Sequence, residues 1–201
     1  MAKSRIEPRL KTIEKAATDF LSALGLDLSE ANLEETPRRM AKAYSFMCRG
    51  IYPEARDELK QILSKRFPTK YKGMIIQEPI KVYSLCSHHL MPVTYDVLFG
   101  YVPLDLVLGF SKSVKAIKLL GARPISQEDF THEIVETFNK ELSPKGMMVV
   151  VRGVHDCMIC RGAETNTVNI TSAVRGTFKR DEKTRSEFLA LAKFNGDNPH
   201  F

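Results

Sequence analysis

The chain has 201 residues and 43% of them are hydrophobic, which is enough to bury a substantial core in one domain with a small appendage. Its formal net charge of +6 predicts an anionic partner such as a nucleotide, a nucleic acid or an acidic surface. The charged N-terminus and the lack of a long apolar run favour a cytoplasmic protein without a signal peptide or a membrane span. Four cysteines in such a chain favour metal binding or catalysis over a disulfide framework.

The first part of the chain, residues 1–70, is predicted to be a helical N-terminal region. Apolar residues recur at steps of three and four from about Glu7 to Leu24, the period of an amphipathic helix. A second helix is expected where Thr36 can cap, Pro37 fits the first turn and Gly50 can end the helix. A third helix is expected from about 53 to 65.

The remaining chain, residues 71–201, has the composition of strands interrupted by helices. Segments rich in β-branched and aromatic residues, separated by Pro, Gly and Asp, predict strands over 74–85, 93–103, 106–111, 146–154 and 166–178. Helices are predicted between the third and fourth strands and at the end of the chain, over 112–121, 126–142 with Ser126 as its cap, and 181–194. This order favours an α+β fold with an antiparallel sheet over alternating βαβ units.

Two short motifs carry side chains that bind metals. Cys86 and His89 form a CxxH pair, and Cys157 and Cys160 form a CxxC pair about seventy residues later. Thiolate and imidazole suit zinc, so all four side chains could close a structural tetrahedral site, or three could bind and leave a position open for water. The spacing alone does not decide between these two sites.

Two further histidines favour the open site. His88 is next to a proposed ligand and His155 lies two residues before another. Imidazoles beside a metal-activated water are typical of hydrolytic enzymes, because they carry protons near neutral pH. The alternative is that both histidines are packed or hydrogen-bonded and that the cysteines are small buried apolar residues.

Basic residues are concentrated in two places. No acidic residue lies between Asp105 and Glu128, a segment with Lys112, Lys115, Lys118 and Arg123. A second basic set lies in the C-terminal third, at Arg152, Arg161, Arg175, Lys179 and Arg180. Either set could bind an anion or form a solvated basic face.

With these motifs in place, the chain resembles GTP cyclohydrolase I over nearly its whole length. The resemblance is carried by "LEETPRRMAKAY", "SLCSHHLMP", "GYVP" with "LGFSK", "ARPISQEDF", "HDCMICRG", "TSAVRGTF" and "TRSEFLAL", in matching order and spacing. It implies a T-fold catalytic core over 71–201, an antiparallel sheet with helices packed on one face, preceded by the helical N-terminal extension. It also implies a homodecamer of two pentamers, in which sheets of several subunits close into a barrel and each pocket is shared.

The resemblance assigns roles to individual positions. It implies zinc as the cofactor, with Cys86, His89 and Cys157 as its ligands, and His88, His155 and Ser111 as catalytic residues. It places Gln127 and Glu128 on the guanine of GTP, and the ribose and triphosphate on Ser111, Lys112, Lys115, Arg161 and Arg39. The implied reaction is the hydrolytic opening of the imidazole ring of GTP, which yields formate and 7,8-dihydroneopterin triphosphate.

The chain departs from the family pattern at several positions, including the residues around Gln127 and Glu128 in "ARPISQEDF". Ser87 replaces a glutamate, Lys115 replaces an arginine, and Cys160 is an additional thiol. These changes keep open a diverged paralogue that acts on another purine nucleotide. A 7-cyano-7-deazaguanine reductase, suggested by "FSKSVKAIK", would leave the CxxH pair unexplained. A zinc-stabilised nucleic-acid-binding protein fits the net charge but not the absence of RNA or DNA module signatures, so we expect neither a nucleic-acid nor a membrane partner.

Overall fold

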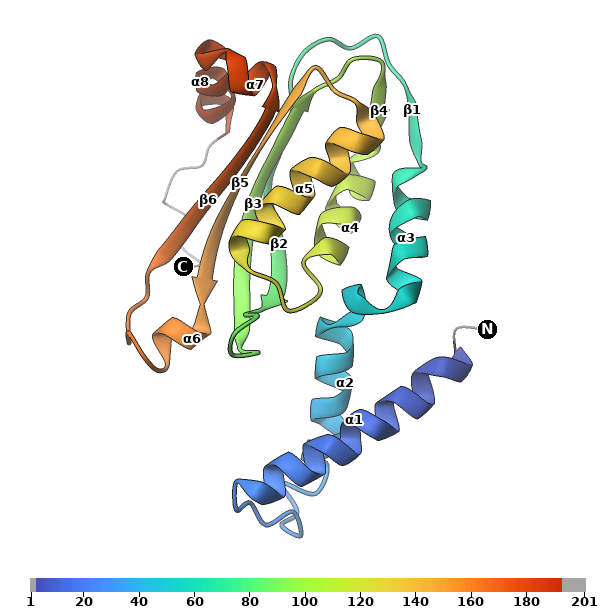
Figure 1. The fold of residues 1–201 in the computed structure, drawn as a ribbon, viewed down its shortest axis with the longest axis vertical. Helices are drawn as coiled ribbons and strands as arrows, with labels where there is room; N and C mark the ends of the chain where they lie inside the picture. Colours follow the sequence, from blue (N-terminus) through green and yellow to red (C-terminus); the bar gives the residue numbers. More distant parts are fainter. Residues whose placement is uncertain (1–2, 193–201) are drawn as a thin grey trace.

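The computed structural model describes residues 3–192, which form an α+β fold around a four-stranded antiparallel sheet (Figure 1). The strand order is β2 (Ile75–Leu85), β3 (Pro92–Val102), β5 (Gly146–His155) and β6 (Val168–Gly176). Every neighbouring pair is antiparallel. The predicted fold class is therefore confirmed.

The sheet is built on the alternation of side chains in its two central strands. Tyr95, Val97 and Phe99 of β3 face the main core and are completely buried. They lie opposite residues 153, 151 and 149 of β5, which point to the same side. Burial of alternate residues fixes the register, because a slip by one position would turn every one of these side chains to the other face.

Two helices cover this face of the sheet, as expected. Helix α4 (Phe110–Leu120) and helix α5 (Gln127–Leu142) lie side by side across it (Figure 1). The predicted cap of α5 is confirmed, since the Ser126 hydroxyl accepts a hydrogen bond from the Asp129 amide at 3.1 Å. The apolar stripe of α5, spaced by four residues, is buried at Phe130, Ile134, Phe138 and Leu142. Helix α3 (Pro53–Leu63) packs beside α4.

The opposite face has a smaller cover at one end. Helices α7 (Thr177–Arg180) and α8 (Glu182–Leu191) contribute Phe178 and Phe188, whose rings meet edge-on at 5.5 Å. They pack with apolar side chains of the sheet's second face, namely Leu98, Met148 and Val150. The helix predicted over 181–194 thus forms over 182–191, and its last two predicted residues lie outside the described part of the chain.

The N-terminal helices form a hairpin that projects from the sheet (Figure 1). Helix α1 (Lys3–Ala23) packs on α2 (Thr36–Met47). The prediction that Thr36 caps α2 is wrong, because Thr36 is the first helical residue and Glu35 holds the cap position without a side-chain cap bond. Gly50 lies beyond the end of α2, in a 3-10 turn (Arg49–Ile51), where a Cβ atom would clash with backbone carbonyls of residues 119 and 122.

Several short elements differ from the prediction. The segment expected as a strand over 106–111 is extended only in β4 (Leu106–Leu108), because α4 begins at Phe110. Strand β1 (Arg66–Pro68) pairs with β4, so the N-terminal region predicted as helical ends in a strand. A one-turn helix, α6 (Asp156–Ile159), follows β5. No helix among residues 3–192 is long and apolar enough to cross a membrane.

Candidate active site

The CxxH pair lies in the tight turn that joins β2 to β3. The Cys86 amide donates to the Met91 carbonyl at 2.8 Å, and the Leu90 amide donates to the Cys86 carbonyl at 2.9 Å. This turn buries the Cys86 side chain and brings its Sγ to 3.6 Å from Nδ1 of His89. Both donor atoms of the pair therefore converge at the end of the sheet.

The third donor comes from α6, which β5 delivers to the same end of the sheet. His155, the last residue of β5, pairs with Val93 of β3, directly after the CxxH turn. As a result the donor atoms of Cys86, His89 and Cys157 all lie within 4.8 Å of one another. Two thiols and an imidazole are a soft donor set that suits zinc.

The two thiols of the group affect each other's ionisation. Burial, followed by the hydrogen bond and charge of the Cys86 thiol, raises the pKa of Cys157 above its ordinary value. Two adjacent thiolates repel each other, and a bound divalent ion offsets that repulsion. The group therefore has the geometry of a metal site.

Cys160 does not join this group. Its thiol is exposed and donates to the Asp156 carbonyl, with 2.9 Å between Sγ and the oxygen. Of the two sites that the spacing allowed, the arrangement favours the one with three protein ligands.

His155 is held beside the metal group by two neighbours. Its Nε2 lies 3.0 Å from Oε1 of Gln127, and its ring meets the Tyr95 ring edge-on at 5.9 Å. Burial lowers the pKa of His155 below its ordinary value, and the charges of Glu128 and Asp156 offset part of that effect. The neutral form of His155 is therefore favoured more than in a free histidine.

A cavity of about 480 Å³ connects the metal group to the start of α5 and to β6. Ser87 and His88 line it from the turn, and Glu128 lines it from α5 with an exposed side chain. The His88 Nδ1 lies 3.9 Å from the Cys86 Sγ. The sequence-predicted residues that the structure brings together here are Cys86, His88, His89, Gln127, Glu128, His155 and Cys157.

The two arginines predicted to bind the anion lie on two segments. Arg39 is on α2, and Arg161 comes just after α6. Arg161 follows Cys157 by four residues, and its positive charge opposes the raised pKa of that thiol. Arg39 is exposed on α2, and α2 reaches the turn through Tyr44, whose hydroxyl is 3.5 Å from the Leu90 carbonyl.

The predicted α4 residues Ser111, Lys112 and Lys115 lie elsewhere. Figure 1 shows that α4 starts beside β4, at the end of the sheet opposite α6. The Phe110 carbonyl accepts from Gln77, which precedes Cys86 by nine residues on β2. At about 3.3 Å per residue along the strand, the start of α4 is roughly 25–30 Å from Cys86. Within one chain these three residues do not reach the cavity.

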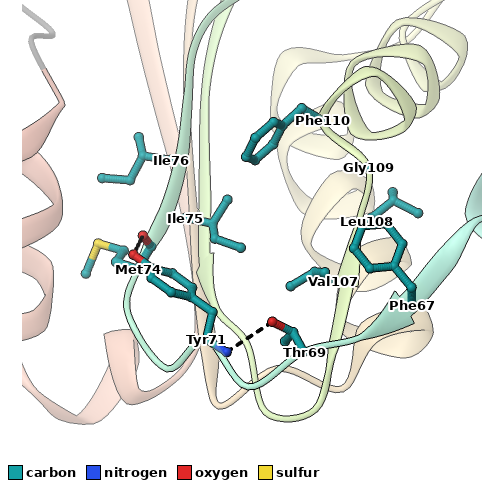
Figure 2. A pocket seen from close by; sticks show the side chains of 10 residues that line it. All are labelled: Phe67, Thr69, Tyr71, Met74, Ile75, Ile76, Val107, Leu108, Gly109 and Phe110. Carbon is teal, nitrogen blue, oxygen red and sulfur yellow. Dashed lines mark hydrogen bonds between the residues drawn. The ribbon is translucent and has the colours of Figure 1, made fainter.

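The start of α4 instead borders a second, apolar cavity of about 550 Å³. Figure 2 shows Tyr71, Ile75 and Phe110 around it, with Phe67 and Leu108 on the side of β1 and β4. Phe67, Tyr71 and Phe110 are each more than half exposed. Exposed apolar patches are typical of interaction sites.

The model of the GTP cyclohydrolase I family matches residues 13–193. The chain belongs to this family. It is 36% identical over 182 residues to GTP cyclohydrolase 1 of Helicobacter pylori and 38% identical over 184 residues to that of Aquifex aeolicus. Each alignment spans 90% of this chain, and 99% and 95% of the respective relative. The chain is therefore a hydrolase of the GTP cyclohydrolase family.

A solved structure, the apo form of an archaeosine synthase QueF-Like, aligns with a TM-score of 0.43 at 16% identity. The alignment covers 53% of this chain and 97% of that one. A similarity this weak does not indicate a function.

Two residues at the site are missing from the sequence-based prediction. The buried Tyr95 ring stacks on Phe130 and supports His155. Gly153 lies in β5 where a Cβ atom would overlap Oε1 of Gln127 and the Tyr95 ring. A glycine inside a strand often marks such a close approach, and "VRGVH" contained that signal.

The three-ligand arrangement predicts which thiols hold the metal. Of these two cysteines Cys157 alone contributes a donor to the group, so zinc-loaded Cys160→Ser should retain as much zinc per chain as the wild type, whereas Cys157→Ser should lose it. Zinc content after desalting, measured by plasma mass spectrometry, checks this. Cys48→Ser, which removes a half-buried thiol of the N-terminal hairpin, is the matched control. Zinc loss from Cys160→Ser would instead indicate a closed four-ligand site.

Proposed function

We propose that this chain is a zinc-dependent enzyme that opens the imidazole ring of GTP and yields 7,8-dihydroneopterin triphosphate and formate. The observation that carries the proposal is the convergence of Cys86, His89 and Cys157 at a cavity that also contains two histidines and a carboxylate. Family membership supports GTP as the substrate. The donor set supports zinc as the metal.

The proposed metal site uses three protein ligands. Zinc bound there would act as a Lewis acid and lower the pKa of a water molecule. All four cysteines of the chain are free thiols, which fits the reducing cytoplasm in which we propose that the enzyme works.

The two histidines are proposed to carry protons. His88 lies on the turn between the ligands Cys86 and His89, where it can support protonation of the purine at N7. His155 is half-buried beside the same group and its lowered pKa favours the neutral form, so it can accept a proton and return it as the ribose opens. A pair of imidazoles on two different elements allows proton transfer at two positions of one substrate.

Glu128 is proposed to recognise guanine. Its exposed carboxylate at the cavity can accept hydrogen bonds from guanine N1 and the 2-amino group together. Gln127 was expected to share this role, but its amide is already hydrogen-bonded to Val151, Asn169 and His155. The proposal therefore assigns base recognition to Glu128.

We propose that each active site is shared between copies of the chain, in a homodecamer of two pentamers. The distance between α4 and the metal group supports this, because Ser111, Lys112 and Lys115 can bind the ribose and triphosphate only from another copy. Arg161 and Arg39, near the turn and α6, would complete the anion site.

The sheet itself supports the assembly. Strands β2 and β6 are its outer strands, and an outer strand can pair with another chain. Tyr83 on β2 and Ile170 on β6 are 67% and 63% exposed. In this proposal residues 71–201 form the T-fold core that closes the barrel, and residues 1–70 are the N-terminal extension.

The zinc-loaded protein should convert GTP with equal release of formate and a pterin chromophore. Glu128→Ala should lower kcat/KM for GTP by about 100-fold or more, because two hydrogen bonds to a charged group are worth about 1.5–3 kcal/mol each. Formate release and pterin absorbance measure the conversion of GTP and its kcat/KM.

Asp129→Ala is the matched control for Glu128→Ala, since it removes an exposed carboxylate on the same turn that does not line the cavity. An unchanged preference of Glu128→Ala for GTP over ATP would contradict the role of Glu128. Turnover of another purine nucleotide but not of GTP would contradict the proposed substrate and favour the diverged paralogue.

A shared site predicts complementation between inactive variants. Lys112→Ala and His155→Ala should each be nearly inactive, yet co-assembled subunits should recover about a quarter of the wild-type activity, because a quarter of randomly formed sites contain neither change. Activity of the co-expressed, purified oligomer measures the recovery.

Co-assembly of Lys112→Ala with Lys115→Ala is the control, since both changes lie on the same helix and every site then contains one of them. If Lys112→Ala and His155→Ala show no recovery although mixed oligomers form, each site lies within a single chain.

A further inference from the structure

Gln127 is a buried polar residue at the first position of α5, with 4% of its surface exposed. Its Nε2 lies 3.1 Å from the Val151 carbonyl, 3.0 Å from the Asn169 carbonyl and 3.2 Å from the Thr171 hydroxyl. Carbonyl oxygens only accept hydrogen bonds, so the end of the amide that faces them must be the NH₂ group. The orientation of the amide is thereby determined by its surroundings.

The other end of the amide determines the state of His155. Since Oε1 of Gln127 can only accept a hydrogen bond, the Nε2 atom of His155 at 3.0 Å must donate one. A neutral imidazole carries one hydrogen, so its Nδ1 then has the free lone pair. Gln127 thus selects one of the two tautomers of His155.

The surrounding packing keeps this hydrogen bond in place. A Cβ atom at position 153 would overlap Oε1 of Gln127, so Gly153 leaves the space that the amide occupies. Tyr95 stacks on Phe130 at 5.2 Å and meets the His155 ring at an interplanar angle of 73°. The imidazole is therefore restrained by an aromatic ring as well as by the amide.

We infer that Gln127 is a positioning residue that acts through His155 rather than on the substrate. It holds His155 as the Nε2–H tautomer and leaves the free lone pair on Nδ1. The catalytic consequence rests on the proposed function, in which His155 carries a proton. The tautomer itself follows from the hydrogen bonds alone.

The tautomer can be measured without substrate. Solid-state ¹⁵N NMR of the zinc-loaded, histidine-labelled protein distinguishes protonated from unprotonated ring nitrogens, and His155→Asn identifies the signals of His155. The wild type should show His155 with Nε2 protonated and Nδ1 unprotonated. Gln127→Ala should shift His155 towards a mixture of tautomers and lower kcat by about 10- to 100-fold with little change in KM.

Thr131→Val is the matched control. The Thr131 hydroxyl donates to the Gln127 backbone carbonyl at 2.7 Å and lies 2.6 Å from the Thr171 hydroxyl, so the change removes buried hydrogen bonds beside Gln127. It leaves the side-chain bond to His155 intact, and both the tautomer and kcat should stay close to those of the wild type.

Two results would overturn the inference: a wild-type His155 protonated at Nδ1, or a Gln127→Ala protein with unchanged tautomer and kcat. The wild-type spectrum decides the first even if the variant does not fold. Inactivity of the wild-type protein towards GTP would overturn the proposed function, whereas the spectrum would still test the role of Gln127.

Discussion

The antiparallel pairing of β3 with β5 is the contact on which the candidate site depends. Cys86 and Cys157 are far apart in the sequence, and only this pairing brings the turn before β3 next to the helix after β5. The register is enforced by buried side chains of both strands, such as Val97 and Val149. A slip by one residue would expose them and move His155 to the other face of the sheet. The packing of the core therefore also sets the geometry of the metal group.

Local patterns predict the parts of the molecule that depend on neighbouring residues. The CxxH pair lies in one turn and α5 follows its four-residue stripe from its Ser126 cap, so short spacings are sufficient to find both. The order of strands and helices likewise follows from composition. These parts include the CxxH pair and the fold class, whereas the approach of Cys157 to that pair depends on the pairing of β3 with β5.

Other features depend on contacts across the fold and are therefore invisible in local patterns. Gln127 resembles a substrate ligand by its place in a motif, but its amide is hydrogen-bonded to backbone carbonyls of β5 and β6. Thr36 has the chemistry of a cap, yet the helix starts one residue earlier than that role requires. Cys160 has a metal-ligand spacing, but its thiol turns to its own helix. In each case a contact made by the folded chain overrides the preference of the residue type.

The distance between the basic start of α4 and the metal group connects the fold to the proposed function. The basic start of α4 and the Cys and His donors occupy opposite ends of one sheet, so a single chain contains both halves of the proposed site without joining them. In the proposed assembly, binding of a triphosphate would require neighbouring copies, and catalysis would depend on the oligomer.

X-ray absorption at the zinc edge of the assembled, zinc-loaded enzyme tests most directly whether the ion keeps an open position. We expect two sulfur ligands at about 2.3 Å, with His89 and one exchangeable oxygen at about 2.0–2.1 Å. Three sulfur ligands and no exchangeable oxygen would contradict a hydrolytic site.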